Sequence, residues 1–348
     1  MEKKYLKVFM FCLPLLIGYS VFAQKKVDTH DTIYYKNYPH SLTLRFYFSQ
    51  KYAILNFKPL DNSKNLEYRA NTKVNMGLGF TYNNFTLNGA LGFGFINNKY
   101  NERNQYNESG KTKSLDLQLH LYPNGWAGDL TVTSYKGFYA YPQGYAVDNP
   151  NFYYFRPDLK FNLFGLTAYR VSNSKRFSYR AAMVQNEWQK RSAGSLLYGG
   201  GIYYSSFKGD SSIVPPKVTS SFAQTGVDNF HFISVGPGIG YAYTAVAAQH
   251  FFIMGSLIAN ANIYFLTDEN NNNNSSTKTN KVNFEPVAIV KAAAGYNGNV
   301  WDVSINWAGN AFLTKDPLAS KTGYLSTGNF RINLAKKIML KKKSKSVQ

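Results

Sequence analysis

The sequence predicts an all-β protein, a single antiparallel transmembrane β-barrel, and three observations lead to this prediction. Stretches of about ten residues, the length that a tilted strand needs to cross a bilayer, alternate apolar and polar side chains and recur along the chain. The chain holds 28 Tyr, 26 Phe and 4 Trp, enough for the aromatic girdles of such a barrel. Although 44% of the residues are hydrophobic, mean hydropathy is only −0.33, and the apolar residues are spread in alternation rather than gathered in long runs.

The first 23 residues have the pattern of a secretory signal peptide. Lys3 and Lys4 precede an apolar run over residues 8–22, and Ala23 is a small residue suited to cleavage. The single cysteine, Cys12, lies inside this segment. The mature chain is therefore expected to lack disulfides, thiolate nucleophiles and cysteine metal sites. Residues 24–40 are polar and are predicted to form a periplasmic arm.

The charge of the mature chain indicates which partners suit it. Without residues 1–23 it carries 36 basic and 18 acidic residues, a net charge of +18. Such an excess suits phosphorylated lipid headgroups, and it would equally suit nucleic acid. An export signal makes nucleic acid the poorer choice. We therefore expect outer-membrane lipid and lipopolysaccharide as partners, with a small solute if the lumen conducts.

The clearest hairpin lies around Asn83-Asn84. Over residues 73–82 one set of alternate positions is apolar, and the same alternation returns over residues 85–96. Two alternating stretches around a two-residue turn predict a β-hairpin. The further predicted strands cover residues 42–57, 114–122, 129–141, 159–170, 177–186, 194–206, 230–244, 249–265, 282–296, 300–312 and 323–336.

These strands give a barrel of residues 41–336, followed by a lysine-rich basic tail of residues 337–348. Residues 267–281 include a run of five asparagines and are predicted to be a low-complexity loop. Both ends of the barrel belong in the periplasm, so the strand number must be even. We prefer about 12 strands, with one segment of residues 159–206 partly lining the interior, and keep 14 as the alternative.

Residues 156–211 also carry a family resemblance. The residues concerned are Arg156-Pro157-Asp158, Gly165, Tyr169-Arg170, Phe177-Ser178-Tyr179-Arg180-Ala181-Ala182, Gln185, Gln189, Arg191-Ser192-Ala193-Gly194-Ser195 and Asp210-Ser211. In these residues the chain resembles the DUF4421 family of uncharacterised outer-membrane proteins. The resemblance implies an outer-membrane barrel of unknown activity in a Gram-negative envelope, with no established catalytic residues to carry over.

A cluster of polar residues within this region is a candidate lumen or anion site. Its members are Arg180, Gln185, Gln189, Arg191, Ser192 and Ser195. One interpretation is a site for an anionic headgroup or solute, because a guanidinium binds phosphate through two hydrogen bonds. The other is a well-bonded turn and luminal network that fixes strand register.

The polar face of residues 114–122 supplies further candidates for the lumen, Asp116, Gln118 and His120. Charges of both signs in a narrow interior are costly unless they pair, so ion pairs and hydrogen bonds are expected there. Such residues either pack the lumen or form a path for a solute.

A lipid hydrolase, of the phospholipase or lipid A deacylase type, is the enzymatic alternative. Ser192 and Ser195 are candidate nucleophiles, but no Gly-x-Ser-x-Gly elbow is present. His120 shares a face with Asp116, yet four strand residues separate them by about 13 Å, too far for a hydrogen bond. The five histidines show no zinc-site spacing. We therefore expect no catalytic residues, metal or cofactor.

The predicted function is a non-enzymatic outer-membrane barrel with a narrow transport role or a lipid- or anion-binding role. The hydrolase and a structural or adhesive barrel are the alternatives. An open lumen lined with charges would favour transport, whereas a filled lumen with ordered outer loops would favour the structural or adhesive role.

Overall fold

The computed structural model describes residues 30–38, 40–82, 85–97, 110–123, 125–272, 275–315 and 322–340. From Asp31 the chain forms one compact unit. It contains the helix α3 (Tyr179–Met183) and the 3-10 turns η1 (Gly94–Ile96) and η2 (Pro216–Ser221). The strands are β1 (Tyr35–Asn37), β2 (Ser41–Phe57), β3 (Leu66–Arg69), β4 (Val74–Tyr82), β5 (Phe85–Leu91), β6 (Lys113–Leu121), β7 (Trp126–Tyr141), β8 (Phe155–Val171), β9 (Glu187–Gln189), β10 (Ala193–Lys208), β11 (Asn229–Ala247), β12 (Phe251–Asn272), β13 (Ser275–Tyr296), β14 (Trp301–Lys315) and β15 (Thr322–Met339).

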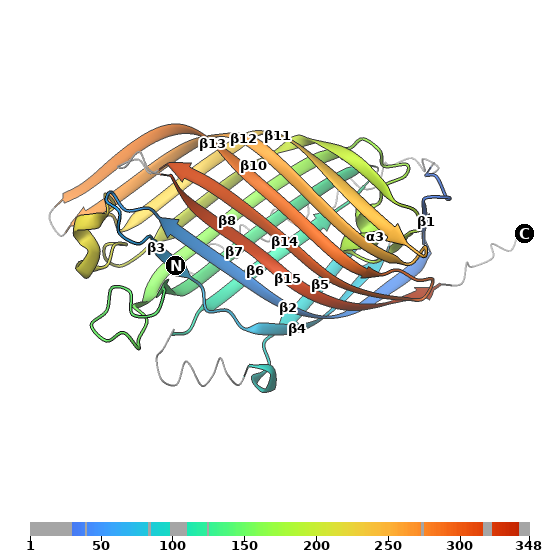
Figure 1. Cartoon of the computed structure of the whole chain (residues 1–348), viewed down its shortest axis with the longest axis horizontal. Helices are drawn as coiled ribbons and strands as arrows, with labels where there is room; N and C mark the ends of the chain where they lie inside the picture. The colour runs from blue at the N-terminus through green and yellow to red at the C-terminus, as the bar shows by residue number, and fades with distance from the viewer. Residues whose placement is uncertain are drawn as a thin grey trace, which may run out of the picture. The chain divides into compact units, whose positions relative to one another are not determined.

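All strands except β1 and β9 belong to one antiparallel sheet of 13 strands that closes into a barrel (Figure 1). The ring runs from β2 through β3, β7, β8 and β10 to β15, and pairing of β15 with β2 completes it. The predicted closed antiparallel barrel is thus confirmed. The predicted count of 12 strands is not confirmed, because ten strands close the ring and β4, β5 and β6 extend it.

The extra strands lie toward one end of the barrel. Residues 54–57 of β2 pair with β3, whereas residues 42–50 on the same edge pair with β4. On the other side, β7 pairs with β3 near Tyr141 and with β6 nearer its start. The wall therefore includes β4, β5 and β6 only toward the end of the barrel at which β2 begins.

Connections differ in length between the two ends of the barrel. One end, the long-loop end, carries residues 58–65, 142–154 and 209–228, and the other, the short-turn end, carries residues 248–250 and 297–300. Residues 172–192 are an exception, because this long connection, with α3 and β9, lies at the short-turn end. Figure 1 shows α3 and β1 at this end and η2, in yellow, at the other.

The outer face of the wall carries an apolar band. Two outward rows of directly opposed residues on β6 to β13 contain only Leu, Val, Ile, Phe and Tyr. The first row is Leu117, Val132, Phe164, Tyr204, Ile233, Phe265 and Val282, and the second is Leu119, Leu130, Leu166, Ile202, Val235, Ile263 and Phe284. Rows of this composition suit contact with lipid hydrocarbon.

Two predicted segments differ from the structure. Residues 177–186 hold α3 rather than a strand, and they lie inside the short-turn end, so one segment of this region does line the interior. Residues 267–272 and 275–281 are strand rather than loop, because β12 and β13 continue their pairing through Glu269↔Lys278 to Asn272↔Ser275. In the barrel, a neighbouring strand satisfies the backbone of these polar residues, so pairing does not require apolar alternation.

Other predictions agree with the structure or concern residues that it does not describe. β4 and β5 form the predicted hairpin, with Tyr82 opposite Phe85. The turn pair Asn83-Asn84 and the signal peptide, residues 1–23, lie outside the described residues. β15 continues to Met339, beyond the residue 336 at which the barrel was expected to end.

A bulge in β7 turns one aromatic side chain to the inside. The register between β7 and β8 shifts between Lys136 and Phe138, and Gly137 has a φ of 93°. An extra residue inverts the alternation of a strand, so Lys136 is exposed while Phe138 is fully buried. A Cβ at position 137 would lie 2.3 Å from the carbonyl oxygen of Lys111.

We expect Gly137→Ala to destabilise the barrel by about 1–3 kcal/mol, because a side chain at this positive φ is strained. Gly255→Ala is the matched control, since its Cβ meets nothing within 4 Å. Thermal unfolding of the refolded proteins in detergent measures the difference. Equal unfolding temperatures for both variants would contradict the structural role of the bulge.

Candidate functional site

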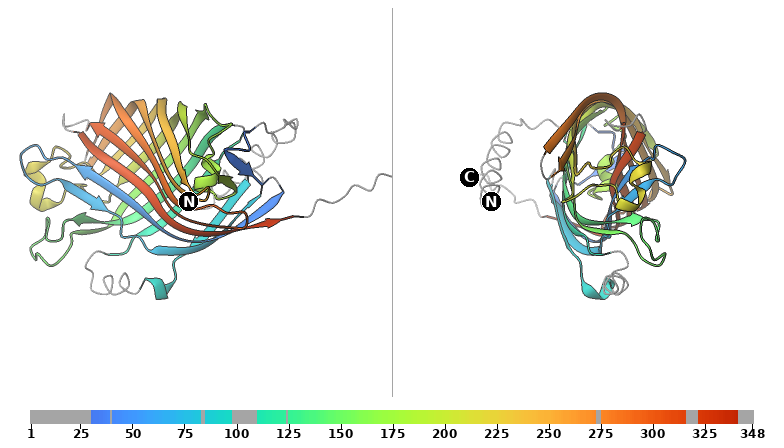
Figure 2. Two further views of the ribbon diagram at one scale, coloured as in Figure 1. Left: turned by 45° about the vertical axis from the view of Figure 1, so that its right-hand side comes forward. Right: turned by 90° about the vertical axis from the view of Figure 1, so that its left-hand side faces the viewer.

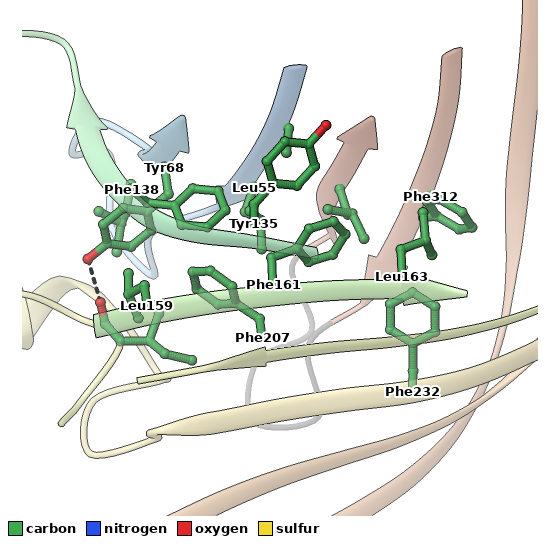
Figure 3. Packing of buried hydrophobic residues seen from close by; sticks show 14 of the residues in the cluster. Leu55, Tyr68, Tyr135, Phe138, Leu159, Phe161, Leu163, Phe207, Phe232 and Phe312 are labelled. Atoms are coloured by element: carbon green, nitrogen blue, oxygen red, sulfur yellow. Dashed lines mark hydrogen bonds between the residues drawn. The ribbon is translucent and has the colours of Figure 1, made fainter. Parts of the chain in front are cut away.

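An apolar cluster, which we call the cap, fills the interior near the long-loop end (Figure 3). Phe138, Phe161 and Phe207 from three neighbouring strands converge with Tyr68 of β3, and each of the four is at most 1% exposed. Ile213 and Val214 add side chains from the loop of residues 209–228. The Tyr68 hydroxyl donates a hydrogen bond to the carbonyl oxygen of Ile213 at 2.7 Å.

Arg156 fastens this loop to the rim of the barrel. Its Nε and Nη2 donate to the two carboxylate oxygens of Asp158 at 2.8 and 2.7 Å. The same guanidinium donates to the carbonyl oxygens of Ser212 at 2.6 Å and Ser211 at 3.1 Å. Asp158 also accepts from the backbone N–H of Asp210 at 2.9 Å. Two separate parts of the family resemblance, residues 156–158 and 210–211, thus meet in one contact.

This ion pair lies beyond the apolar band, on the long-loop side of the outward residue Lys160. Burial raises the pKa of the Asp158 carboxyl, but the hydrogen bonds from Arg156 and Asp210 outweigh it and lower the pKa to about 2. Burial lowers the pKa of the Arg156 guanidinium, yet its contacts with Asp158 raise it above the ordinary value. Both groups are therefore charged at neutral pH.

Residues 172–192, which we call the plug, close the short-turn end from inside. Ser178 caps α3, since its hydroxyl oxygen accepts a hydrogen bond from the Ala181 N–H at 3.0 Å. The same hydroxyl donates to the carboxylate of Glu187. β9 pairs with β1, which attaches the N-terminal arm to the plug. Figure 2 shows α3 within the ring of strands at this end.

Gln189 is the centre of the plug. Its side-chain oxygen accepts from the Ser178 N–H at 2.9 Å. Its nitrogen donates to the carbonyl oxygens of Arg176 at 2.7 Å and Arg191 at 3.0 Å. The side chain is 1% exposed, so one buried amide joins residues 176–178 to residues 189–191 at the other end of the plug.

The other predicted members of the polar cluster take different places. Arg180 Nε lies 3.5 Å from Glu187 Oε1. The buried side chain of Gln185 donates to the Ala182 carbonyl oxygen at 2.8 Å. Ser192 accepts from the Val246 N–H at 2.9 Å, and Ser195 accepts from the Asn173 N–H at 3.0 Å. The side chain of Arg191 is exposed at the margin.

Polar side chains of the wall hold the main chain of the plug. Asn297 donates to the carbonyl oxygen of Ala181 at 3.2 Å. Asn306 donates to the carbonyl oxygens of Ala182 and Met183 at 3.1 and 3.3 Å.

Arg45 of β2 holds the last turn of α3. Its Nη2 donates to the Val184 carbonyl oxygen and to the Thr81 hydroxyl at 2.8 Å, and its Nη1 donates to the Asn88 side-chain oxygen at 2.9 Å. With the two asparagines, it satisfies the four successive carbonyl oxygens of residues 181–184, which a helix of this length leaves without internal partners.

A buried ion pair supports the wall beside the plug. Lys337 Nζ contacts both carboxylate oxygens of Asp302, at 2.5 and 2.7 Å, and donates to the Gly298 carbonyl at 2.8 Å. Both side chains are 0% exposed. Lys337 was expected to begin the basic tail, and the structure instead places it in β15 as an ion-pair partner.

A polar chamber of about 40 Å³ lies between the cap and the plug. Asp129 is its centre: one carboxylate oxygen lies 2.6 Å from His120 Nδ1, and the other accepts from Lys291 Nζ at 2.6 Å. Thr131, Thr133 and Thr167 add hydroxyl groups to the lining. The chamber has room for a few water molecules and presents both charges to them.

Of the three predicted lumen residues, the structure describes the side chain of His120 alone; those of Asp116 and Gln118 lie outside the described residues. Sequence reasoning did not name Asp129 as a site residue. The register of the β6–β7 hairpin places it directly opposite His120, so counting outward from the turn would have found it. Lys291 lies 162 residues away in sequence and meets Asp129 only because the sheet closes.

The described residues give no support to hydrolytic chemistry. No serine lines the chamber, and the hydrogen-bond partner of His120 there is Asp129. The described part of the chain also holds no group of three or more His, Cys, Asp or Glu side chains placed to bind a metal. No helix in that part has the length and apolar character to span a membrane.

The pairing and the side-chain pattern define a closed antiparallel β-barrel whose lumen is capped at one end and plugged at the other. Residues 29–335 match the domain of unknown function DUF4421, and the chain belongs to this family. No curated protein matches the sequence.

Among solved structures, the barrel is similar to the outer-membrane protein OmpT of Vibrio cholerae, with a TM-score of 0.26 and 10% identity, over 85% of this chain and 98% of that one. A deltaS2 mutant of the TodX monoaromatic hydrocarbon channel gives a TM-score of 0.26 and 5% identity, over 87% and 91% of the chains. The toluene transporter TodX of Pseudomonas putida gives 0.19 and 8%, over 85% and 89%.

The carboxylate of Asp158 should make the barrel more stable above pH 4 than below it. Its pKa is lowered in the folded state, so its contribution is complete above the unfolded value and is lost as the pH falls toward about 2. Asp158→Asn should therefore lower the unfolding temperature at pH 7 and change it little at pH 2. Asp148→Asn, an exposed loop carboxylate 94% accessible to solvent, is the control. A deficit that persists unchanged at pH 2 would refute this account.

Proposed function

We propose that this chain is a non-enzymatic outer-membrane protein whose lumen is a gated path for a small polar solute. The apolar band on the outer face supports a membrane-spanning barrel. The observation that carries the gated path is the chamber around Asp129, His120 and Lys291, enclosed between the cap and the plug. Buried charges add little stability to a filled barrel compared with apolar packing, so their presence favours a role in passage.

The plug is the part of this path suited to move. Its carbonyl oxygens are bonded to Arg45, Asn297 and Asn306, and water can replace such bonds at a net cost of about 1 kcal/mol each. The cap, in contrast, is an apolar cluster that would expose many aromatic side chains if it opened. A displacement of the plug would also carry the N-terminal arm, because β1 pairs with β9.

The double substitution Asn297→Ala/Asn306→Ala should raise the open probability of the barrel about tenfold or more, because three hydrogen bonds to the plug are lost. Single-channel recording in planar bilayers measures this. Asn262→Ala is the matched control: it removes a buried hydrogen bond of 2.6 Å between two wall strands, to Ser234. If the double variant is as silent as the wild type, the barrel is a static structural or adhesive one.

The chamber charges should set the ion preference of the opened barrel. In the Asn297→Ala/Asn306→Ala background, Asp129→Asn leaves Lys291 without its carboxylate partner and should shift the reversal potential toward anions. Lys291→Gln should shift it toward cations. Identical reversal potentials in a salt gradient would place the current outside the chamber.

A further inference from the structure

Four lysines form a row on the outer surface of the barrel, at the long-loop side of the apolar band. The strands β6, β7, β8 and β10 lie side by side (Figure 1), and cross-strand register places Lys113 opposite Lys136, Lys136 opposite Lys160 and Lys160 opposite Lys208. All four side chains are exposed. Adjacent strands are about 4.8 Å apart, so the four backbone positions span about 14 Å.

The positive charge of this row is uncompensated within the described residues. None of the four lysines forms an ion pair there, and like charges directly opposite one another destabilise a sheet. Further around the barrel, the same row continues with Asn229, Glu269 and Lys278. Glu269 accepts from Asn229 at 2.7 Å and pairs with Lys278 at 2.6 Å, so the charge there is neutralised.

A second outward row lies next to the lysines on the short-turn side; it begins with Leu115 on β6 and is polar on β7, β8 and β10. Ser134 donates to the Asn162 side-chain oxygen at 2.9 Å, and the Asn162 nitrogen donates to the Ser206 hydroxyl at 3.0 Å. The row continues through His231 and Thr267. The next two rows toward the short-turn end are the entirely apolar ones that begin with Leu117 and Leu119.

On β7, β8 and β10 the surface therefore changes from cationic to hydrogen-bonding to apolar over three successive rows. An amphiphile with a phosphorylated sugar headgroup presents the same order: phosphate, hydroxyl and amide groups, then acyl chains. We propose that the face of β6, β7, β8 and β10 is a docking surface for a phosphorylated glycolipid of the outer leaflet. The lysine row binds the phosphates, Ser134, Asn162 and Ser206 contact the sugar, and the apolar rows contact the acyl chains.

Other occupants fit this surface less well. A second copy of the chain in the same membrane orientation would bring its own lysine row to the same level and repel. A free anion would use the lysines but not the apolar rows below them. The inference rests on the outer-membrane location proposed above and is independent of the gate, because it concerns the outer face alone.

The test compares binding of fluorescent bisphosphorylated lipid A to the full mature barrel in neutral detergent micelles. The double variant Lys136→Gln/Lys160→Gln, which removes the two central charges, should bind on the order of tenfold more weakly. Lys278→Gln, at the same level of the barrel but paired with Glu269, should bind as the wild type does. Dephosphorylated lipid A should bind the wild type and the double variant equally.

Three results of the binding assay would overturn the proposal. One is equal affinity of the wild type and the double variant for bisphosphorylated lipid A. The second is binding of dephosphorylated lipid A to the wild type as tightly as the bisphosphorylated form. The third is full displacement of lipid A by inorganic phosphate, which would make the row a site for a free anion.

A stability measurement guards against a folding defect in the double variant. Without lipid A, Lys136→Gln/Lys160→Gln should unfold at a higher temperature than the wild type, because opposed like charges are removed. Added lipid A should raise the unfolding temperature of the wild type more than that of the variant. A variant that unfolds at a lower temperature without lipid would contradict the charge repulsion on which the proposal rests. Conductance plays no part in either assay, so a failure of the gate leaves these results interpretable.

Discussion

Closure of the sheet between β2 and β15 is the constraint on which the rest of the structure depends. These two strands pair from Ser41↔Met339 to Asn56↔Tyr324, so neither presents a free edge. In hydrocarbon an unpaired backbone group costs several kcal/mol, which makes closure a requirement for a strand-built wall. Once the ring is closed, each side chain points in or out, and a slip of one residue would exchange the two faces of a strand. The chamber inside and the lysine row outside both follow from the same register.

The chain fills the interior of this ring in two different ways. At the long-loop end, the bulge at Gly137 brings Phe138 inward to join an apolar cluster. At the short-turn end, residues 172–192 enter the lumen as a polar and apolar plug that bonds to the wall. The two closures leave the ionised groups of Asp129 and Lys291 between them, where neither bulk water nor lipid compensates their charge. Each of these two groups therefore depends on the other to compensate its charge inside the chamber.

Alternation predicted the wall because a period of two is a local property of each strand, as the β4–β5 hairpin shows. It failed at Phe177 and Tyr179, which alternate with polar residues as a strand would, although Ser178 caps a helix there. A helix of five residues has little stability of its own, and the wall contacts that select it are distant in sequence. The His120–Asp129 contact was within reach of hairpin counting. The contact with Lys291 was not, because only the closed ring brings β13 to β7.

A single hairpin, β8 and β10 with the plug between them, connects the cap, the plug and the outer surface. β8 begins at the Arg156–Asp158 pair that holds the loop following β10, and the residues joining the two strands are the plug itself. The residues that carry the family resemblance, from Arg156 to Ser211, are therefore those of this hairpin and its two ends. Lys160 and Lys208 lie opposite one another on its outer face. A lipid phosphate bound there would draw together the same two strands whose short-turn ends flank the plug. The surface that we propose for a glycolipid and the plug that we propose as a gate therefore share one hairpin, although the first lies outside the barrel and the second inside it.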